Sequence, residues 1–511
     1  MIRSLAFFAL ATFLHAAASG QERYREPFRP QFHFTPERNW MNDPNGMVFY
    51  DGEWHLFYQY NPHGDRWGHM SWGHAVSRDL IRWEHLPLAL AEEDGIMIFS
   101  GSAVVDWKNT SGFGKGNKPP LVAIYTGHRE GRQDQRLAYS NDRGRSWSKF
   151  AGNPVLDLKM ADFRDPKVFW HEGKSHWVMT VALPAEKKVH FYASPDLKAW
   201  RYVGEFGPAG ATDGAWECPD LFPLPVDGGG TRWVLIVNIN PGGPAGGSGC
   251  QYFVGEFDGE KFTPDHVILA DEPARPASED ALWADFGPDF YAAVSWSDVP
   301  RDDGRRIWIG WMSNWTYAND VPTSPWRSAM TIPRELRLAK TSAGLRLRQK
   351  PVKELDSLHG KASSFERGTL AEANAWVARQ DVHSGPLELS FTLENGDGLS
   401  GVKFYSGKEQ ATIVAVDRQA GRVLVDRTKS GKIDFHPRFA AKHSAPLFQK
   451  DGPVKLRIIV DTSSAEVFVN DGEQVLTSLI FPAPAGSSLE FFGTAQPTIS
   501  ALELWLLRRA W

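Results

Sequence analysis

Three short motifs between residues 40 and 220 each place a carboxylate among aromatic and turn-forming residues. They are Trp-Met-Asn-Asp-Pro-Asn-Gly at residues 40–46, Phe-Arg-Asp-Pro at 163–166 and Trp-Glu-Cys-Pro-Asp at 216–220. Carboxyl groups on either side of a glycosidic bond are the usual machinery of sugar hydrolysis, one as nucleophile or base and the other as proton donor. Asp43, Asp165 and Glu217 are therefore candidate catalytic residues.

Each motif also has a purely structural interpretation. The sequence around Asp43 would predict a β-turn if it stood alone. Arg164 and Asp165 could form a salt-bridged strand start, although the adjacent arginine also predicts an ionised Asp165 with a lowered pKa. Glu217 could lie on a strand edge, but its apolar neighbours Trp and Cys favour the protonated form that a proton donor requires. Because the three motifs recur at matching positions, we favour the catalytic interpretation.

A loose unit repeats through the first three hundred residues: a polar start, a short apolar strand, a glycine turn and a strand of alternating aromatics. Residues 43–58 and 165–179 share this design closely. Unit starts can be placed near Asp43, Ser102, Asp165, Glu217 and Asp285. Five four-stranded sheets arranged radially predict an all-β fold with a five-bladed β-propeller at residues 27–343. Its innermost strands would direct the acidic residues into one central channel.

A Ser-x-Asp element precedes a tryptophan at residues 77–83, 140–147 and 194–200. Residues 140–147 fit the Ser-x-Asp-x-Gly-x-x-Trp pattern of sialidase propellers, which supports the architecture but suggests a competing function. A sialidase would need several arginines for its substrate's carboxylate and a tyrosine nucleophile. The three motifs offer carboxylates and one well-placed arginine, so a neutral sugar fits better.

The pattern changes near residue 345, where we expect a linker at residues 344–356 and then a β-sandwich at 357–511. Segments 387–393, 412–416, 454–460 and 465–469 alternate apolar and polar residues. Asn-Asp-Gly at 470–472 predicts a hairpin turn. This second domain could pack against the propeller, bind polysaccharide or form a dimer, and we favour packing because the connector is short.

Residues 1–20 have Arg3, an apolar stretch at 5–14 and small residues at 16–20. This pattern predicts a secretory signal peptide, and the apolar run is too short for the alternative of a membrane anchor, which needs about 20 residues. We therefore expect a secreted or periplasmic protein without a membrane span.

The net charge of −5, with no long charge run, argues against nucleic acid as a partner.

Two cysteines are too few for a disulfide framework, and we expect Cys218 and Cys250 to be free thiols, although a single bridge is an alternative. The 16 histidines show no helical metal-ligand spacing, so we predict neither a metal nor another cofactor. Most of the 21 tryptophans should pack in the core. Trp40, Trp67 and Trp315 are the candidates for substrate contact.

The three motifs together resemble those of glycoside hydrolase family 32, the invertases, inulinases and levanases. Segments 58–62, 67–74, 99–102 and 456–469 extend the resemblance over nearly all of the chain. The resemblance implies a five-bladed propeller with a C-terminal sandwich. It implies that Asp43 is the nucleophile, Glu217 the general acid/base and Asp165 the transition-state stabiliser. It also implies a subsite for the terminal fructosyl unit lined by Asn42, Gln59, Trp67, Phe99, Ser100, Arg164 and Trp315.

The activity that this resemblance implies is retaining exo-β-fructosidase activity on levan or inulin and on sucrose. Residues 310–327 look more like the exo-acting fructanases than dedicated invertases. The alternatives are a fructosyltransferase, a sucrose-preferring invertase and a non-catalytic fructan-binding protein. Neither the preferred fructan linkage nor the oligomeric state follows from the sequence.

Overall fold

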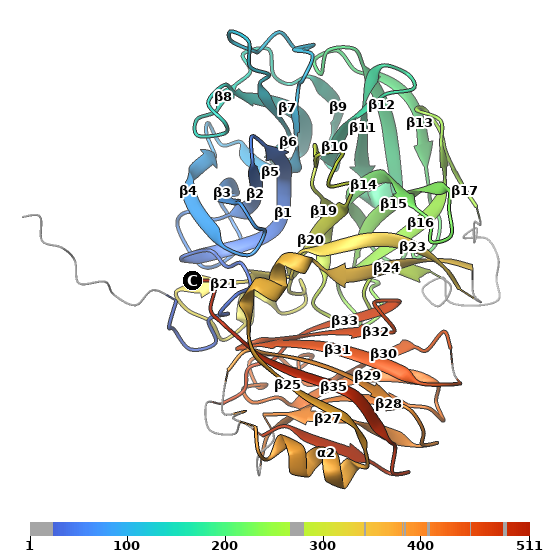
Figure 1. The fold of residues 1–511 in the computed structure, drawn as a ribbon. Coiled ribbons are helices and arrows are strands. Elements are labelled where there is room, and N and C mark those ends of the chain that lie inside the picture. The colour runs from blue at the N-terminus through green and yellow to red at the C-terminus, as the bar shows by residue number, and fades with distance from the viewer. Residues whose placement is uncertain are drawn as a thin grey trace, which may run out of the picture.

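The structure is a computed structural model that describes residues 24–265, 281–341, 344–380, 382, 385–405, 409–449, 451–483 and 488–511. The expected signal peptide, residues 1–20, lies outside these ranges. Within them, no helix is long and apolar enough to cross a membrane. The described chain is built almost entirely of β-strands arranged in two domains (Figure 1).

Five sheets form the predicted propeller. Their innermost strands are β1 (Asn39–Tyr50), β5 (Met97–Val105), β10 (Arg164–His171), β14 (Ala215–Pro225) and β19 (Tyr291–Ser295). Each of these strands contacts the next, and β19 contacts β1, so the five strands close a ring around a central channel. The innermost strands are mostly buried, because each packs between its own sheet and the neighbouring sheets.

Each blade adds strands outward in antiparallel order. Blade one has β2 (Glu53–Tyr60), β3 (Ser71–Ser77) and β4 (Trp83–Leu90), and blade two has β6 (Leu121–Arg129), β7 (Arg132–Ser140), β8 (Ser148–Lys149) and β9 (Leu156–Met160). Blade three has β11 (His176–Leu183), β12 (Lys188–Ser194) and β13 (Arg201–Phe206). Blade four has β15 (Thr231–Asn240), β16 (Gly249–Phe257), β17 (Phe262–Pro264) and β18 (Leu282–Trp283). Blade five has β20 (Arg306–Met312), β22 (Ala329–Met330), β23 (Arg334–Thr341) and β24 (Gly344–Pro351), while β21 (Trp326–Arg327) pairs with β1.

Two expectations about the fifth blade are wrong. Its innermost strand begins at Tyr291, not near Asp285, because the buried Asp285 carboxylate precedes that strand and pairs with Arg334 at 3.0 Å. Most of the expected linker at 344–356 is strand β24, whose alternating leucines pack on the blade. The connection to the second domain is therefore short: Val352 and the 3-10 helix η3 (Lys353–Leu358).

The repeated Ser-x-Asp elements form the same turn between the third and fourth strands of the first three blades. In blade one, the Asp79 carboxylate accepts hydrogen bonds from the backbone N–H groups of Ile81 and Arg82, and the Trp83 indole N–H donates to the carbonyl of Leu80. Trp147 and Trp200 make the equivalent indole bonds to Gly144 and Leu197. These elements are structural turns, including the one that resembles the sialidase pattern.

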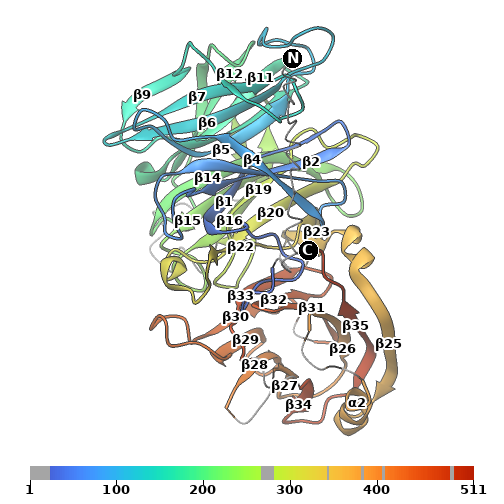
Figure 2. The same ribbon diagram turned by 90° about the vertical axis from the view of Figure 1, so that its left-hand side faces the viewer.

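Residues 359–507 form the predicted sandwich of two sheets (Figure 2). One sheet contains β25 (His359–Gly368), β35 (Ile499–Leu507), β26 (Leu387–Leu393), β31 (Val454–Asp461), β32 (Ser464–Val469) and β33 (Gln474–Leu479). The other contains β30 (Lys442–Pro446), β29 (Arg422–Lys429), β28 (Ala411–Asp417), β27 (Leu399–Phe404) and β34 (Glu490–Gly493). One helix, α2 (Leu370–Val377), begins with a capping box formed by Thr369 and Glu372. All four predicted strand segments are confirmed.

The predicted turn at 470–472 joins β32 to β33 and also touches the propeller. Asn470, Asp471 and Gly472 all have positive φ. The Gly472 carbonyl accepts a hydrogen bond from the Gln349 backbone N–H at 3.0 Å, and a Cβ at Gly472 would lie 1.7 Å from the Gln349 carbonyl oxygen. Only glycine fits this close approach of the two domains.

Buried charges hold the two domains together. The two oxygens of Glu466 in the sandwich contact Arg334 of blade five and the His33 ring, and the other His33 nitrogen lies 2.8 Å from Asp461. Burial alone would lower the pKa of His33, but the hydrogen bonds and charges of Asp461 and Glu466 outweigh it and raise this pKa to about 9. His33 is therefore a cation at neutral pH, and the interface alternates cations and carboxylates.

We predict that Glu466→Gln lowers the free energy of unfolding by about 3 kcal/mol, since it leaves Arg334 and His33 buried with one carboxylate fewer. The midpoint of urea unfolding measures the change. Glu490→Gln is the control, because Glu490 forms an exposed pair with Lys403, which should contribute less than about 1 kcal/mol. Equal midpoints for the two variants would contradict the role of the interface charges.

Candidate active site

Every innermost strand is irregular at the same level, near its start. The register with the second strand of the blade shifts between residues 41 and 44, 98 and 101, 164 and 167, 217 and 220, and 291 and 294. Asp165, Cys218 and Ala292 take positive φ within these bulges. A β-bulge redirects side chains out of the regular alternation. The bulges thus bring the three acidic residues together at one end of the channel.

Asp43 is buried and held by neutral donors. The Asn42 amide donates to its Oδ1 at 3.0 Å and the Ser100 hydroxyl to its Oδ2 at 2.7 Å. Asn42 is itself fixed by the Trp40 indole N–H at 2.7 Å. Burial, joined by the nearby charge of Glu217, raises the pKa of Asp43, although the two hydrogen bonds favour its ionised form. The Asp43 carboxylate therefore has a fixed orientation and faces the channel.

Asp165 contacts Asp43 indirectly through Cys218. The Cys218 backbone N–H donates to Asp165 Oδ2 at 2.9 Å, and the Cys218 Sγ lies 3.5 Å from Asp43 Oδ2 and 3.6 Å from Asp165 Oδ2. The pKa of Asp165 is raised to about 7, chiefly by burial, with the charges of Glu217 and Asp43 adding to it. The expectation of a lowered pKa is wrong, because burial outweighs the attraction of Arg164.

Arg164 binds Glu217 directly, not Asp165. Its Nε and one terminal nitrogen donate to Glu217 Oε1 at 3.0 and 2.9 Å, and its other terminal nitrogen donates to Asp162 at 2.7 Å. The Tyr291 hydroxyl donates to Glu217 Oε2. Three blades thus meet at one carboxyl group: Arg164 from blade three, Glu217 from blade four and Tyr291 from blade five.

All ten predicted site residues line one pocket of about 350 Å³, at the end of the channel where the innermost strands begin. They are Asn42, Asp43, Gln59, Trp67, Phe99, Ser100, Arg164, Asp165, Glu217 and Trp315. Gln59 is fixed by the hydrogen bond from its side-chain amide to the Ile98 carbonyl, at 3.0 Å. Trp67, 42% exposed, packs edge-on against Phe99.

Sequence reasoning missed three residues around this pocket. His128 lines it and stacks on Phe99 with the ring centroids 4.3 Å apart, Tyr291 contacts Glu217, and Cys218 contacts Asp43 and Asp165. No local signal marks His128 or Tyr291, because both reach the pocket only through the packing of blades. Trp40, a candidate for substrate contact, is fully buried and stacks behind Trp315. Trp40 therefore packs behind two pocket residues, Trp315 and Asn42, and does not line the pocket itself.

Cys218 and Cys250 are both buried free thiols, as predicted. Burial, with the adjacent carboxylates, raises the pKa of Cys218 well above its usual value, so it remains a neutral thiol. Within the part of the chain that the structure describes, no group of three His, Cys, Asp or Glu side chains is arranged to hold a metal ion. The site therefore presents carboxyl groups, one guanidinium, hydroxyls and aromatic faces.

Comparison with known proteins matches both domains to one family. The model of the glycosyl hydrolases family 32 N-terminal domain matches residues 33–351, and that of the family 32 C-terminal domain matches residues 354–506. A levanase of Bacillus subtilis is 50% identical, over 97% of this chain and 73% of that protein. An extracellular exo-inulinase of Aspergillus awamori is 41% identical, over 93% of each chain. The crystal structure of an exo-inulinase from Aspergillus awamori has a TM-score of 0.87 at 38% identity, covering 96% of this chain and 100% of that one.

The family models cover both domains and nearly all of the described residues, and the architecture is the one that the sequence resemblance implied. The chain belongs to glycoside hydrolase family 32.

Proposed function

We propose that this glycoside hydrolase is an exported exo-β-fructosidase that releases terminal fructose from fructans and from sucrose. The observation that carries the proposal is the pocket itself, which gathers three carboxyl groups and all seven predicted subsite residues in about 350 Å³. That volume is near the lower end of the range of about 300–1,000 Å³ typical of small-ligand sites, and it suits a chain end better than a run of polymer. The levanase and exo-inulinase relatives support a fructan substrate. The sequence of residues 1–20 and the extracellular relative support export.

In the proposed first step, Asp43 attacks the anomeric C2 of the terminal fructosyl unit while Glu217 gives its proton to the departing oxygen. The bond from C2 to that oxygen breaks and a covalent fructosyl–enzyme forms. Negative charge appears on Glu217 as its proton leaves. Arg164 and Tyr291 donate hydrogen bonds to its two oxygens, so they stabilise this charge as it develops.

In the second step, Glu217 takes a proton from water, and the water oxygen attacks C2 to release fructose and regenerate Asp43. Two displacements at the same carbon retain the configuration. Asp165 would stabilise the positive charge that builds on the sugar ring in both transition states, because its carboxylate faces the same pocket as Asp43. Asn42 and Ser100 hold the nucleophile in the attacking orientation.

The alternatives differ in what accepts the fructosyl unit. A fructosyltransferase would use a sugar hydroxyl in place of water, and a sucrose-preferring invertase would favour the disaccharide over polymers. A non-catalytic fructan-binding protein would not need a nucleophile, a proton donor and a stabiliser in one pocket. The complete set of three carboxyl groups therefore favours catalysis.

The product profile tests the activity. With levan, inulin and sucrose supplied separately, we expect fructose to be released linearly from the first minutes, as resolved by chromatography. Oligosaccharides from the start would mean endo-cleavage, and growing oligosaccharides at high sucrose would mean transfer. No release from any of the three substrates would overturn the proposed function.

We expect Asp43→Ala and Glu217→Ala each to lower kcat by about a thousandfold or more while folding normally, since each removes a chemical step. Steady-state rates on sucrose measure this, and Glu84→Ala, which removes an exposed carboxylate on β4, is the matched control. A fructoside with an activated leaving group should partly rescue Glu217→Ala but not Asp43→Ala. Near-wild-type turnover by either variant would remove that residue from the mechanism.

Ser100→Ala should move the acidic limb of the profile of kcat/KM against pH upward by about one pH unit. Asp43 must be ionised to attack, and the Ser100 hydroxyl stabilises its ionised form, so the loss of this bond raises the pKa of Asp43 further. Ser102→Ala is the control: the Ser102 hydroxyl, two residues along the same strand, accepts a hydrogen bond from the Val168 backbone N–H, so its loss should leave the limb in place. An unchanged limb in Ser100→Ala would contradict the assignment of Asp43 as the ionising nucleophile.

A further inference from the structure

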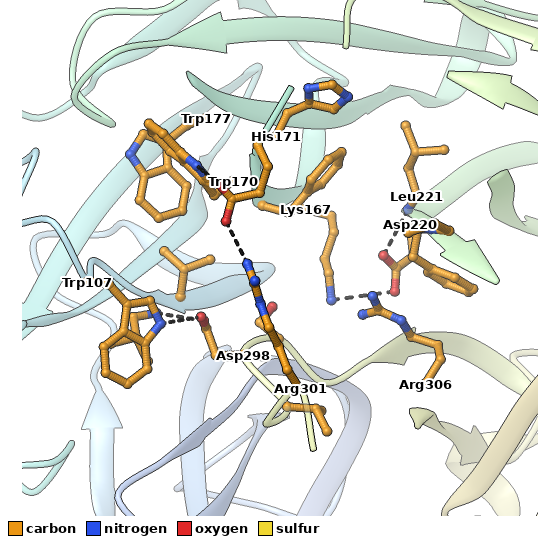
Figure 3. Close-up of a pocket in the computed structure, with 18 of the residues that line it drawn as sticks. Trp107, Lys167, Trp170, His171, Trp177, Asp220, Leu221, Asp298, Arg301 and Arg306 are labelled. Atoms are coloured by element: carbon orange, nitrogen blue, oxygen red, sulfur yellow. Dashed lines mark hydrogen bonds and ion pairs between the residues drawn. The ribbon is translucent and has the colours of Figure 1, made fainter. Parts of the chain in front are cut away.

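A second pocket, of about 840 Å³, lies at the end of the propeller channel opposite the active site. Figure 3 shows the side chains that line it. Three innermost strands, β5, β10 and β14, line both pockets: their first residues lie at the active site and their later residues at the second cavity. In β14, for example, Glu217 lines the active site and Pro223 the second cavity, separated by about 20 Å of extended strand. The two pockets share no lining residue, so the second cavity is not an extension of the active-site subsites.

Four tryptophans are among the residues that line the second pocket. Trp107, at its rim, is 61% exposed, and the Lys108 ammonium lies 4.4 Å from the ring centroid of Trp170. Trp177 and Trp233 complete the set. Among the described residues, the two exposed tryptophans are Trp67 at the active-site pocket and Trp107 here. A flat indole face exposed beside a cavity is suited to stacking on the C–H face of a sugar ring.

The polar groups of this pocket are largely compensated within the protein. Lys167 pairs with Asp220 at 3.5 Å and Arg301 pairs with Glu172 at 3.0 Å (Figure 3). Asp298 accepts hydrogen bonds from the Trp107 indole N–H and the backbone N–H of Val105, each at 2.8 Å. Paired charges of both signs do not favour a polyanion. They do offer donors and acceptors to the hydroxyl groups of an uncharged ligand.

Arg306 adds donors without a carboxylate partner of its own. Its guanidinium packs over the Phe222 ring at 5.0 Å and makes only long bonds, of 3.3 and 3.4 Å, to Trp296 and Ser295. Within the described ranges of the chain, no carboxylate lies within ion-pair distance of it. A planar group with spare N–H donors can bind two adjacent hydroxyls of a sugar.

We propose that this second pocket binds a neutral oligosaccharide, specifically a segment of the fructan polymer away from the chain end that is being hydrolysed. The proposal rests on the proposed function, since it takes its ligand class from that substrate. A cavity of 840 Å³ falls within the range of about 300–1,000 Å³ typical of small-ligand sites and is more than twice the size of the active-site pocket. Bound there, polymer stays at a high local concentration near the active site, while sucrose gains nothing.

The test compares polymer with sucrose in Trp107→Ala. We expect KM for levan or inulin of high chain length to rise by about three- to tenfold, the effect of losing one aromatic stacking contact, with kcat unchanged. Kinetics on sucrose should stay at wild-type values. Trp107→Phe keeps an aromatic face and loses the bond to Asp298, so it should recover most of the polymer affinity. Tyr202→Ala is the matched control, because Tyr202 is a 48% exposed aromatic on β13 that lines neither pocket.

A binding measurement separates this proposal from the proposed function. In Glu217→Ala, which should not digest the polymer, retardation in gels containing levan or inulin should exceed that in gels containing dextran and should fall when Trp107→Ala is added. Wild-type protein that cleaves sucrose and polymer, with Trp107→Ala equal to it on both, would overturn the second site and leave the activity intact. An equal loss on sucrose would also overturn it, as would self-association in sedimentation experiments that Trp107→Ala abolishes.

Discussion

Three carboxyl groups share one pocket with a single guanidinium, and the surrounding residues must offset the cost of placing these charges close together. Like charges at close range raise one another's pKa, and burial does the same. Hydrogen-bond donors stabilise each carboxyl group. Asn42 and Ser100 donate to Asp43, the Cys218 backbone N–H donates to Asp165, and Arg164 and Tyr291 donate to Glu217. Each carboxyl group thus has a different environment, as the proposed division into nucleophile, stabiliser and proton donor requires.

The propeller suits this task because five strands from five separate sheets begin at one level. Every donor to a carboxyl group except Asn42 comes from a different blade than the group it binds. A regular strand alternates its side chains between two faces, whereas the bulge at the start of each innermost strand breaks the alternation where the functional residues stand. Beyond their bulges, β5, β10 and β14 keep a regular register with the second strands of their blades, and their far ends line the second cavity.

The sequence predicted the architecture well because propeller blades are local. Each blade is encoded by one continuous stretch of the sequence, with its own strand alternation, and the ten site residues belong to short motifs. What the sequence did not show depends on contacts between blades. Arg164 is adjacent to Asp165 in the chain, yet its side chain reaches Glu217 across the blade boundary. Tyr291 and His128 have no motif, and Asp285 was mistaken for a blade start because its partner Arg334 is 49 residues away.

The interface with the sandwich closes the propeller ring at its one covalent gap, between blade five and blade one. On the side of blade five, Glu466 contacts Arg334 and the Ile332 backbone N–H. On the side of blade one, it contacts His33, which precedes β1 in the chain. A single sandwich carboxylate therefore contacts both ends of the ring, which the pairing of β21 with β1 also joins. The strands that meet at this seam, β1 and β19, carry Asp43 and Tyr291, so a seam that opened would separate Asp43 from the tyrosine that donates a hydrogen bond to Glu217. The sandwich thus supports the seam through buried ion pairs and hydrogen bonds, while none of its described residues lines the active-site pocket.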